Sequence, residues 1–132
     1  MATNTAYTSN VTAKKQDGPL SANGRITYPA TAIVAADYTQ VDLGFIPTYI
    51  RWCDVTSRIQ VEWFEGMAAN SCVKTAANGT RTLEVTGGNG GITVCDSDGT
   101  ANTAGRSFKV LQNATLAAIL ASEVINYRAS GG

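Results

Sequence analysis

The chain has 132 residues, a formal net charge of zero and no histidine, and only 15% of its residues are charged. This length suits a single domain. Zero net charge argues against a non-specific nucleic-acid binder, which needs Lys and Arg to neutralise phosphates. The lack of histidine excludes Ser-His-Asp and Cys-His catalysis. No apolar run approaches the roughly 18 residues that a membrane helix needs. From the net charge and the missing apolar run together, we expect neither nucleic-acid nor membrane partners.

The cysteines, Cys53, Cys72 and Cys95, are odd in number and widely spaced. That pattern fits neither a disulfide framework nor a zinc motif. We expect buried or half-buried free thiols, which suit assembly in a reducing cytosol. Residues 1–10 are polar and lack the hydrophobic region of a signal peptide.

Residues 1–24 form a polar leader whose only aromatic residue is Tyr7. The leader has little to bury, so we expect an extended N-terminal arm that a partner orders, with a frayed terminus as the alternative. The candidate partner-contact residues are Tyr7, Lys14, Lys15 and Pro19. The rest of the chain, residues 25–132, is predicted to form the folded domain.

The pattern turns to short strands after the leader. Val, Ile, Thr and aromatic residues, interrupted by Pro and Gly, predict strands over 25–28, 31–35 and 38–43. A further strand is predicted over 48–55, followed by a turn at 54–57.

Strict alternation of polar and apolar residues marks the next strand, Arg58 to Trp63. A period of two predicts one buried and one solvated face. Ile59, Val61 and Trp63 are predicted to face the core, and Arg58, Gln60 and Glu62 the solvent. Together with the strand over 48–55, this segment predicts a β-hairpin built of large side chains.

Small residues at 66–77 predict a loop. Residues 80–86 alternate again, which predicts a strand with Leu83 and Val85 buried and Arg81 at the rim. The glycine-rich run 87–91 is interpreted as a hairpin loop. Further strands are predicted over 92–95, 105–111 and 123–129, and one short helical turn over 115–121 after a possible cap at Asn113. About seven to nine short strands with frequent turns predict an all-β fold, an antiparallel β-sandwich or barrel.

None of the motifs that resemble chemical sites is complete. Asp96 to Gly99 resembles the start of a calcium loop but lacks the later bidentate acid. The run 87–91 is not followed by the Lys-Ser/Thr of a phosphate-binding loop. Glu62 and Glu65 form the best carboxylate pair, and solvated strand residues are the simpler interpretation. We therefore expect no enzyme activity, no metal and no cofactor.

Four aromatic residues, Tyr49, Trp52, Trp63 and Phe64, lie in the hairpin. Aromatic residues in strands bury large areas and usually serve a core or an interface. Three roles are open for these side chains. In order of preference they are the core, a subunit or partner interface, and a sugar-stacking platform.

Several segments resemble small virion structural proteins of tailed bacteriophages. In that group a Gly-Phe-x-Pro strand, a turn ending in Arg, a Glu-Trp-Phe-Glu-Gly-Met strand and a Thr-Arg-Thr-Leu-Glu…Gly-Ile-Thr-Val hairpin recur. The corresponding residues here are Gly44, Phe45, Pro47, Arg58, Glu62–Met67, Thr80–Glu84 and Gly91–Val94. The resemblance covers roughly residues 40–129 and excludes the leader; the Gly-Asn-Gly-Gly run and the loop over 96–105 depart from it.

The resemblance implies a capsid decoration, or cement, protein on the outside of the virion. Its implied partners are the major capsid protein and further copies of itself, with a homotrimer favoured, and it would be made in the host cytoplasm. It would stabilise the shell by bridging capsomers. The alternative is a stand-alone β-sandwich module that binds carbohydrate or a host surface.

Overall fold

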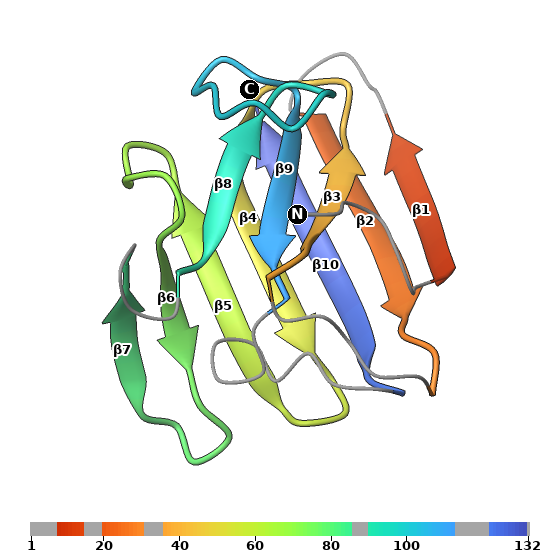
Figure 1. Cartoon of the computed structure of the whole chain (residues 1–132), viewed down its shortest axis with the longest axis vertical. Coiled ribbons are helices and arrows are strands. Elements are labelled where there is room, and N and C mark those ends of the chain that lie inside the picture. Colours follow the sequence, from red (N-terminus) through yellow and green to blue (C-terminus); the bar gives the residue numbers. More distant parts are fainter. Residues whose placement is uncertain (1–7, 15–19, 31–35, 86–89, 113–121, 132) are drawn as a thin grey trace.

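The computed structural model describes residues 8–14, 20–30, 36–85, 90–112 and 122–131, with only the backbone described for 8–14. These residues contain ten strands in two antiparallel sheets, in the all-β, sandwich-like arrangement that the sequence predicts (Figure 1). The large sheet has the order β1-β2-β10-β4-β5-β6-β7, and the small sheet the order β3-β9-β8. The strands are β1 (Thr8–Lys14), β2 (Leu20–Thr27), β3 (Tyr38–Asp42), β4 (Pro47–Asp54), β5 (Ile59–Phe64), β6 (Cys72–Thr75), β7 (Arg81–Glu84), β8 (Ile92–Cys95), β9 (Ser107–Leu111) and β10 (Val124–Gly131).

The β4–β5 hairpin is confirmed. Its strands pair from Tyr49 with Phe64 to Asp54 with Ile59. The turn is closed by Asp54, whose Oδ1 accepts hydrogen bonds from the backbone N–H groups of Thr56 and Ser57, both at 3.0 Å. Val61 and Trp63 are buried as the alternation predicts, because this face of β5 packs against the core.

Three aromatic rings join the sheets at the centre of the core. Trp52 of β4 lies edge-on to Phe108 of β9, with ring centroids 6.1 Å apart, and stacks on Tyr127 of β10 at 6.0 Å. All three side chains are at most 3% exposed. Figure 1 shows the small sheet in front of the middle of the large sheet. The three rings pack between the two sheets, because they come from strands of both.

The prediction of an extended arm over residues 1–24 needs correction at 8–14 and 20–24, the part of this segment that the structure describes. β1 pairs with β2 over seven residues, and β2 pairs with β10 over eight, so both strands belong to the large sheet. Backbone pairing stabilises this polar segment, and burial of Ala22 and Ile26 anchors β2 to the core. The boundary at residue 24 falls inside β2.

A close approach at Gly24 helps to hold β2 in place. Tyr127 lies opposite Gly24 in the ladder, and a Cβ atom on Gly24 would lie 2.4 Å from the Tyr127 hydroxyl oxygen. The missing side chain therefore makes room for the Tyr127 ring that reaches into the core.

Two further predictions about the 66–91 segment are wrong. The predicted loop over 66–77 contains β6, which pairs with both β5 and β7. The run 87–91 does not connect a hairpin, because β7 pairs with β6 in the large sheet and β8 pairs with β9 in the small one. The chain therefore passes from the large sheet to the small one between Glu84 and Ile92.

The predicted burial of Leu83 and Val85 is also wrong. Leu83 is 65% exposed and Val85 47% exposed. The reason is the face on which they lie: Leu83 pairs with Val73, and Val73 pairs with Glu62, so Leu83 and Val85 share with Arg81 the face of the large sheet that points away from the small sheet. Alternation marks two distinct faces of a strand but does not tell which of them packs against the other sheet.

The remaining strands agree with the sequence. Strands predicted over 38–43, 92–95, 105–111 and 123–129 correspond to β3, β8, β9 and β10. The predicted strand over 31–35 and the helical turn over 115–121 lie outside the described residues, as does the cap residue Asn113.

Candidate interaction surface

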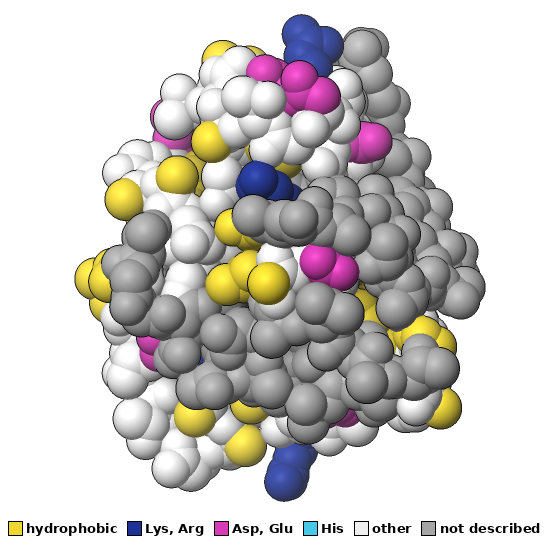
Figure 2. Space-filling model, in the orientation of Figure 1, with side chains coloured by type: hydrophobic (Ala, Val, Ile, Leu, Met, Phe, Trp, Pro, Cys, Tyr) yellow, Lys and Arg dark blue, Asp and Glu magenta, His cyan; other side chains and the backbone are white. Residues whose placement is uncertain are grey.

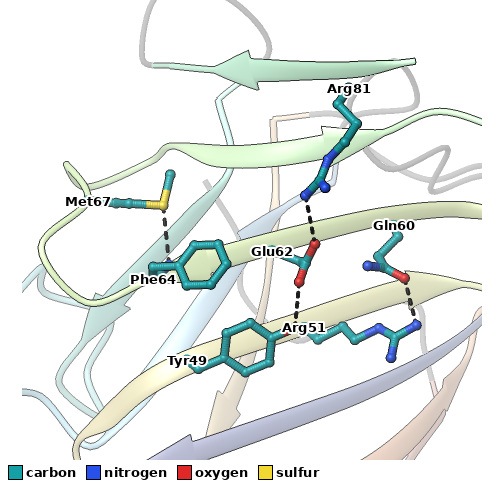
Figure 3. Close-up of polar contacts among 7 residues, drawn as sticks. All are labelled: Tyr49, Arg51, Gln60, Glu62, Phe64, Met67 and Arg81. Carbon is teal, nitrogen blue, oxygen red and sulfur yellow. Dashed lines mark hydrogen bonds and ion pairs between the residues drawn. The ribbon is translucent and has the colours of Figure 1, made fainter. Parts of the chain in front are cut away.

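The outer face of the large sheet, which points away from the small sheet, carries a cluster of side chains that are distant in sequence. We call Tyr49, Glu62, Phe64 and Arg81 the outer-face cluster. They come from β4, β5 and β7 (Figure 3). They share this face because, along β4 and β5, they alternate with the buried residues of the core.

Glu62 is the centre of the polar part of the cluster. Its Oε2 accepts a 2.6 Å hydrogen bond from the Tyr49 hydroxyl, and its Oε1 lies 3.3 Å from Nη2 of Arg81. The Glu62 side chain is 15% exposed and the Arg81 side chain 61%. The carboxylate is thus fixed between two partners, and Arg81 keeps much of its guanidinium surface accessible.

The Tyr49 hydroxyl is held in its protonated form. Burial, followed by the hydrogen bond to Glu62 and the charge of that carboxylate, raises the pKa of Tyr49 to about 12. The phenol therefore remains a hydrogen-bond donor throughout the physiological range. Beside it, Arg51 Nη2 donates a 2.7 Å hydrogen bond to Gln60 Oε1, so the outer face of β4 and β5 presents an ordered polar pattern.

The apolar part of the cluster lies at the end of the same hairpin. The Phe64 ring lies 5.3 Å from the Tyr49 ring at 52°, and Phe64 is 45% exposed. Gly66, with φ of 94°, permits the tight turn after β5, in which the Phe64 backbone N–H lies 3.2 Å from the sulfur of Met67, a residue that packs against the core. An exposed aromatic side chain rimmed by ordered polar groups is typical of a protein-binding surface.

A second group of polar residues is buried at the opposite end of the hairpin. Asp54 and Glu123 are 0% and 4% exposed, and Ser57 donates a hydrogen bond from its hydroxyl to Glu123 Oε1. Burial, partly offset by the backbone hydrogen bond from Ser57, raises the pKa of Asp54 to about 6. Sequence reasoning identified the turn but not this cluster, because nothing local in the sequence places Glu123 beside residue 57.

The thiols behave as the sequence predicts: Cys53, Cys72 and Cys95 are free. Burial raises the pKa of Cys72 to about 12 and that of Cys95 to about 11. Both sulfurs are therefore protonated at neutral pH and are poor nucleophiles.

The other candidate residues have structural partners. Glu65, the second member of the carboxylate pair, donates its backbone N–H to Thr48 O at 2.9 Å and closes the hairpin end. Asp96 and Gly99 form a turn through a 2.9 Å backbone hydrogen bond, and Asp98 Oδ1 accepts the N–H of Thr100 at 2.9 Å. These bonds explain the Asp-Ser-Asp-Gly pattern as turn chemistry.

Of the predicted partner-contact residues, only Lys14 is described, and its backbone pairs with Ser21. Tyr7, Lys15 and Pro19 lie outside the described residues. Of the four hairpin aromatics, Trp52 and Trp63 belong to the core, whereas Tyr49 and Phe64 belong to the outer-face cluster.

A cleft of about 130 Å³ opens at the end of β5, and its walls are largely apolar. Its lining comprises Trp63, Met67, Ala69, Val94, Ala101, Asn102 and Thr103. Among the described residues, no group of three or more His, Cys, Asp or Glu side chains is arranged to hold a metal ion. Within the same part of the chain, no helix has the length and apolar character to span a membrane.

Comparison of the chain with protein families, with curated proteins and with solved structures found no match. Functional interpretation therefore depends on the sequence resemblance and on the geometry described above.

Proposed function

We propose that this chain is a structural protein of a tailed-phage virion, a decoration protein that binds the outer capsid and stabilises contacts between capsomers. The proposal starts from the resemblance of roughly residues 40–129 to phage virion proteins. One structural observation supports it most strongly. Two of the family-like segments, 62–67 and 80–84, converge on the outer face of the large sheet, where Glu62 and Arg81 form an ion pair at 3.3 Å.

The outer-face cluster has the physical character of a contact surface. Phe64 and Arg81 are both substantially exposed, and aromatic and Arg side chains are enriched at the centres of protein interfaces. Glu62 fixes its partners before binding, which reduces the conformational entropy that a complex must lose. Many copies on one shell add avidity to modest single contacts.

The cluster replaces the leader as the proposed capsid contact. Deleting residues 2–23 would remove β1 and part of β2, and a loss of binding would then report a damaged sheet. Single substitutions at exposed side chains avoid this difficulty. Val55 offers a matched control, because it is 45% exposed, as Phe64 is, and lies in the turn at the other end of the hairpin.

The test measures occupancy on capsids purified from a phage that lacks this gene. The purified chain should bind them, and Phe64→Ser and Arg81→Ala should each lower the affinity at least about tenfold, an effect of about 1.4 kcal/mol. Val55→Ser should bind as the parent does. Cryo-electron microscopy of the virion should then show the outer face of the large sheet against the capsid.

Two outcomes would contradict the proposal. The first is absence of the chain from particles, or its location in the tail. The second is unchanged occupancy of both cluster variants while Val55→Ser is equally unaffected, which would remove the outer-face cluster from the contact.

A carbohydrate- or host-surface-binding module is the second candidate, favoured by the pair of half-buried Tyr49 and exposed Phe64 beside polar Arg51 and Gln60. Trp52 and Trp63 cannot serve as a sugar platform, because they are 0% and 5% exposed. A glycan array on which the chain binds a sugar, with binding lost in Phe64→Ala and retained in Val55→Ser, would favour this function over capsid decoration.

A further inference from the structure

The edge strand β7 is short, with four residues, but it lacks two other features that protect a sheet edge. Besides shortness and charged side chains, natural edges carry prolines or bulges that prevent pairing with another chain. Arg81–Glu84 contains no proline, and its pairing with β6 runs without a bulge. Its basic residue, Arg81, is directed back over the sheet to Glu62 (Figure 3). Figure 2 shows hydrophobic side chains at the left margin, beside the end of β7.

The hydrogen-bond pattern shows which backbone groups face outward from this edge. Ala76 N–H donates to Thr80 O at 2.9 Å, which makes this the hydrogen-bonded type of pair. Antiparallel pairs alternate between bonded and non-bonded types, so Thr82 and Glu84 are bonded to β6. The N–H and C=O groups of Arg81 and Leu83 therefore point away from β6, toward the free edge.

We propose that β7 pairs in antiparallel fashion with β7 of a second copy of this chain, around a two-fold axis at Leu83. The two large sheets then join into one continuous sheet. Each Leu83 donates its N–H to the carbonyl of Leu83 of the partner subunit. Each Val85 donates its N–H to the carbonyl of Arg81 of the partner subunit.

The side chains of β7 are complementary to themselves in this register. Leu83, 65% exposed in the single chain, packs on Leu83 of the partner subunit, and the aliphatic stem of Arg81 packs on Val85 of the partner subunit. Thr82 lies opposite Glu84 of the partner subunit, so no like charges face each other directly. The formal net charge of zero also means that two copies do not repel each other.

This inference goes beyond the proposed function and does not depend on capsid binding. A dimer formed through β7 also differs in symmetry from the trimer that the phage resemblance implies. A two-fold pair uses the same surface on both copies, whereas the homotrimer that the phage resemblance implies needs two different surfaces.

The test is sedimentation velocity and native mass spectrometry of the full chain over a concentration series. Leu83→Pro removes an N–H that points to the free edge and leaves the bonds between β6 and β7 in place. Leu83→Ser keeps the N–H and removes the apolar contact. Val55→Ser, which removes an equally accessible apolar side chain elsewhere, is the control.

The parent chain and Val55→Ser should form dimers, and both Leu83 variants should raise the dimer dissociation constant at least about tenfold while their far-ultraviolet circular dichroism stays unchanged. A parent chain that is monomeric, trimeric or forms open-ended polymers overturns the proposal. A dimer that persists in Leu83→Ser and in folded Leu83→Pro also overturns it. If Leu83→Pro fails to fold, Leu83→Ser alone decides.

Discussion

The centre of the large sheet and its β7 end are built from similar strands and have opposite environments. At the centre, Trp52 and Val61 are fully buried under the small sheet. At the β7 end, Leu83 and Val85 are about half exposed or more. The difference lies in the face that carries the apolar side chains: Trp52 and Val61 point toward the small sheet, whereas Leu83 is in register with Val73 and Glu62 on the outer face. Alternation in a sequence therefore specifies a strand with two distinct faces, while the register with the neighbouring strands decides whether the apolar face becomes core or contact surface.

Truncation of a central residue should have the largest effect on this comparison. Trp52→Ala removes a ring that contacts both Phe108 and Tyr127. It should lower the free energy of unfolding by about 3–5 kcal/mol. Leu83→Ala at the uncovered end should change it by less than about 0.5 kcal/mol in dilute solution. Urea unfolding measures both, and similar losses in the two variants would show that the β7 end is covered after all.

The parts of the fold that the sequence predicts are those where large side chains alternate. β4 and β5 are recognisable because the large apolar side chains of Trp52, Val61 and Trp63 lie on one face and are buried in the core. The strand predicted over 25–28 matches only the end of β2, and β1 and the first half of β2 escape prediction, because their polar residues form strands through backbone pairing with β10 and with each other. The burial of Leu83 is mispredicted since no local signal tells which face of β7 is in register with the core-facing residues of β5 and β6.

The buried carboxyl of Asp54 should make stability depend on pH. Its pKa in the folded chain is about 6 against an ordinary value of 3.8, because burial disfavours the charged form. The folded state then holds more protons than the unfolded state between these values, and the stabilisation present below about pH 4 is lost as pH rises through about 6. The loss is at most about 3 kcal/mol.

Asp54→Asn should remove this dependence. The amide oxygen can still accept the N–H groups of Thr56 and Ser57, and no charge is buried. We expect the variant to be more stable than the parent above about pH 6, as measured by urea unfolding across a pH series. A parent slope that persists unchanged in Asp54→Asn would assign the titration to another group. Asp98→Asn on an exposed turn is the control; the backbone and side-chain hydrogen bonds of Thr100 lower the pKa of Asp98, so its small contribution has the opposite sign.

Gly24→Ala tests the flank of the core that lies away from β7. The new Cβ would lie 2.4 Å from the Tyr127 hydroxyl oxygen, and the Tyr127 ring is confined by Trp52 and Phe108. We expect a loss of about 1–3 kcal/mol from overpacking. Asn23→Ala, next to it on the exposed face of β2, should have little effect. Equal stability of Gly24→Ala and the parent in thermal unfolding would mean that the ring can move aside.

The candidate surface is less predictable from sequence than the fold is. The pattern places Glu62 on the solvated face of its strand, and the structure agrees. Nothing local indicates that Arg81 reaches Glu62, because that contact depends on β6, which lies between them and was predicted as a loop. Residues brought together by an unrecognised strand cannot be paired from spacing alone.

Glu62→Gln should have the smallest effect on stability and the most local effect on chemistry. It removes the charge that joins the central strands to β7 but keeps an acceptor for Tyr49, so the free energy of unfolding should fall by less than about 1 kcal/mol. The pKa of Tyr49 should move from about 12 toward its ordinary value of 10.0 without reaching it, because burial is the largest cause of the increase. Carbon-13 NMR of ring-labelled tyrosine measures the change: near pH 11 about a tenth of Tyr49 is ionised in the parent and a larger fraction in the variant. Arg51→Gln should shift this pKa in the opposite direction, since the Arg51 charge lowers it. A Tyr49 pKa that is unaffected by Glu62→Gln would mean that the carboxylate does not hold the cluster together. The strand β7 would then be joined to the central strands through its pairing with β6 alone.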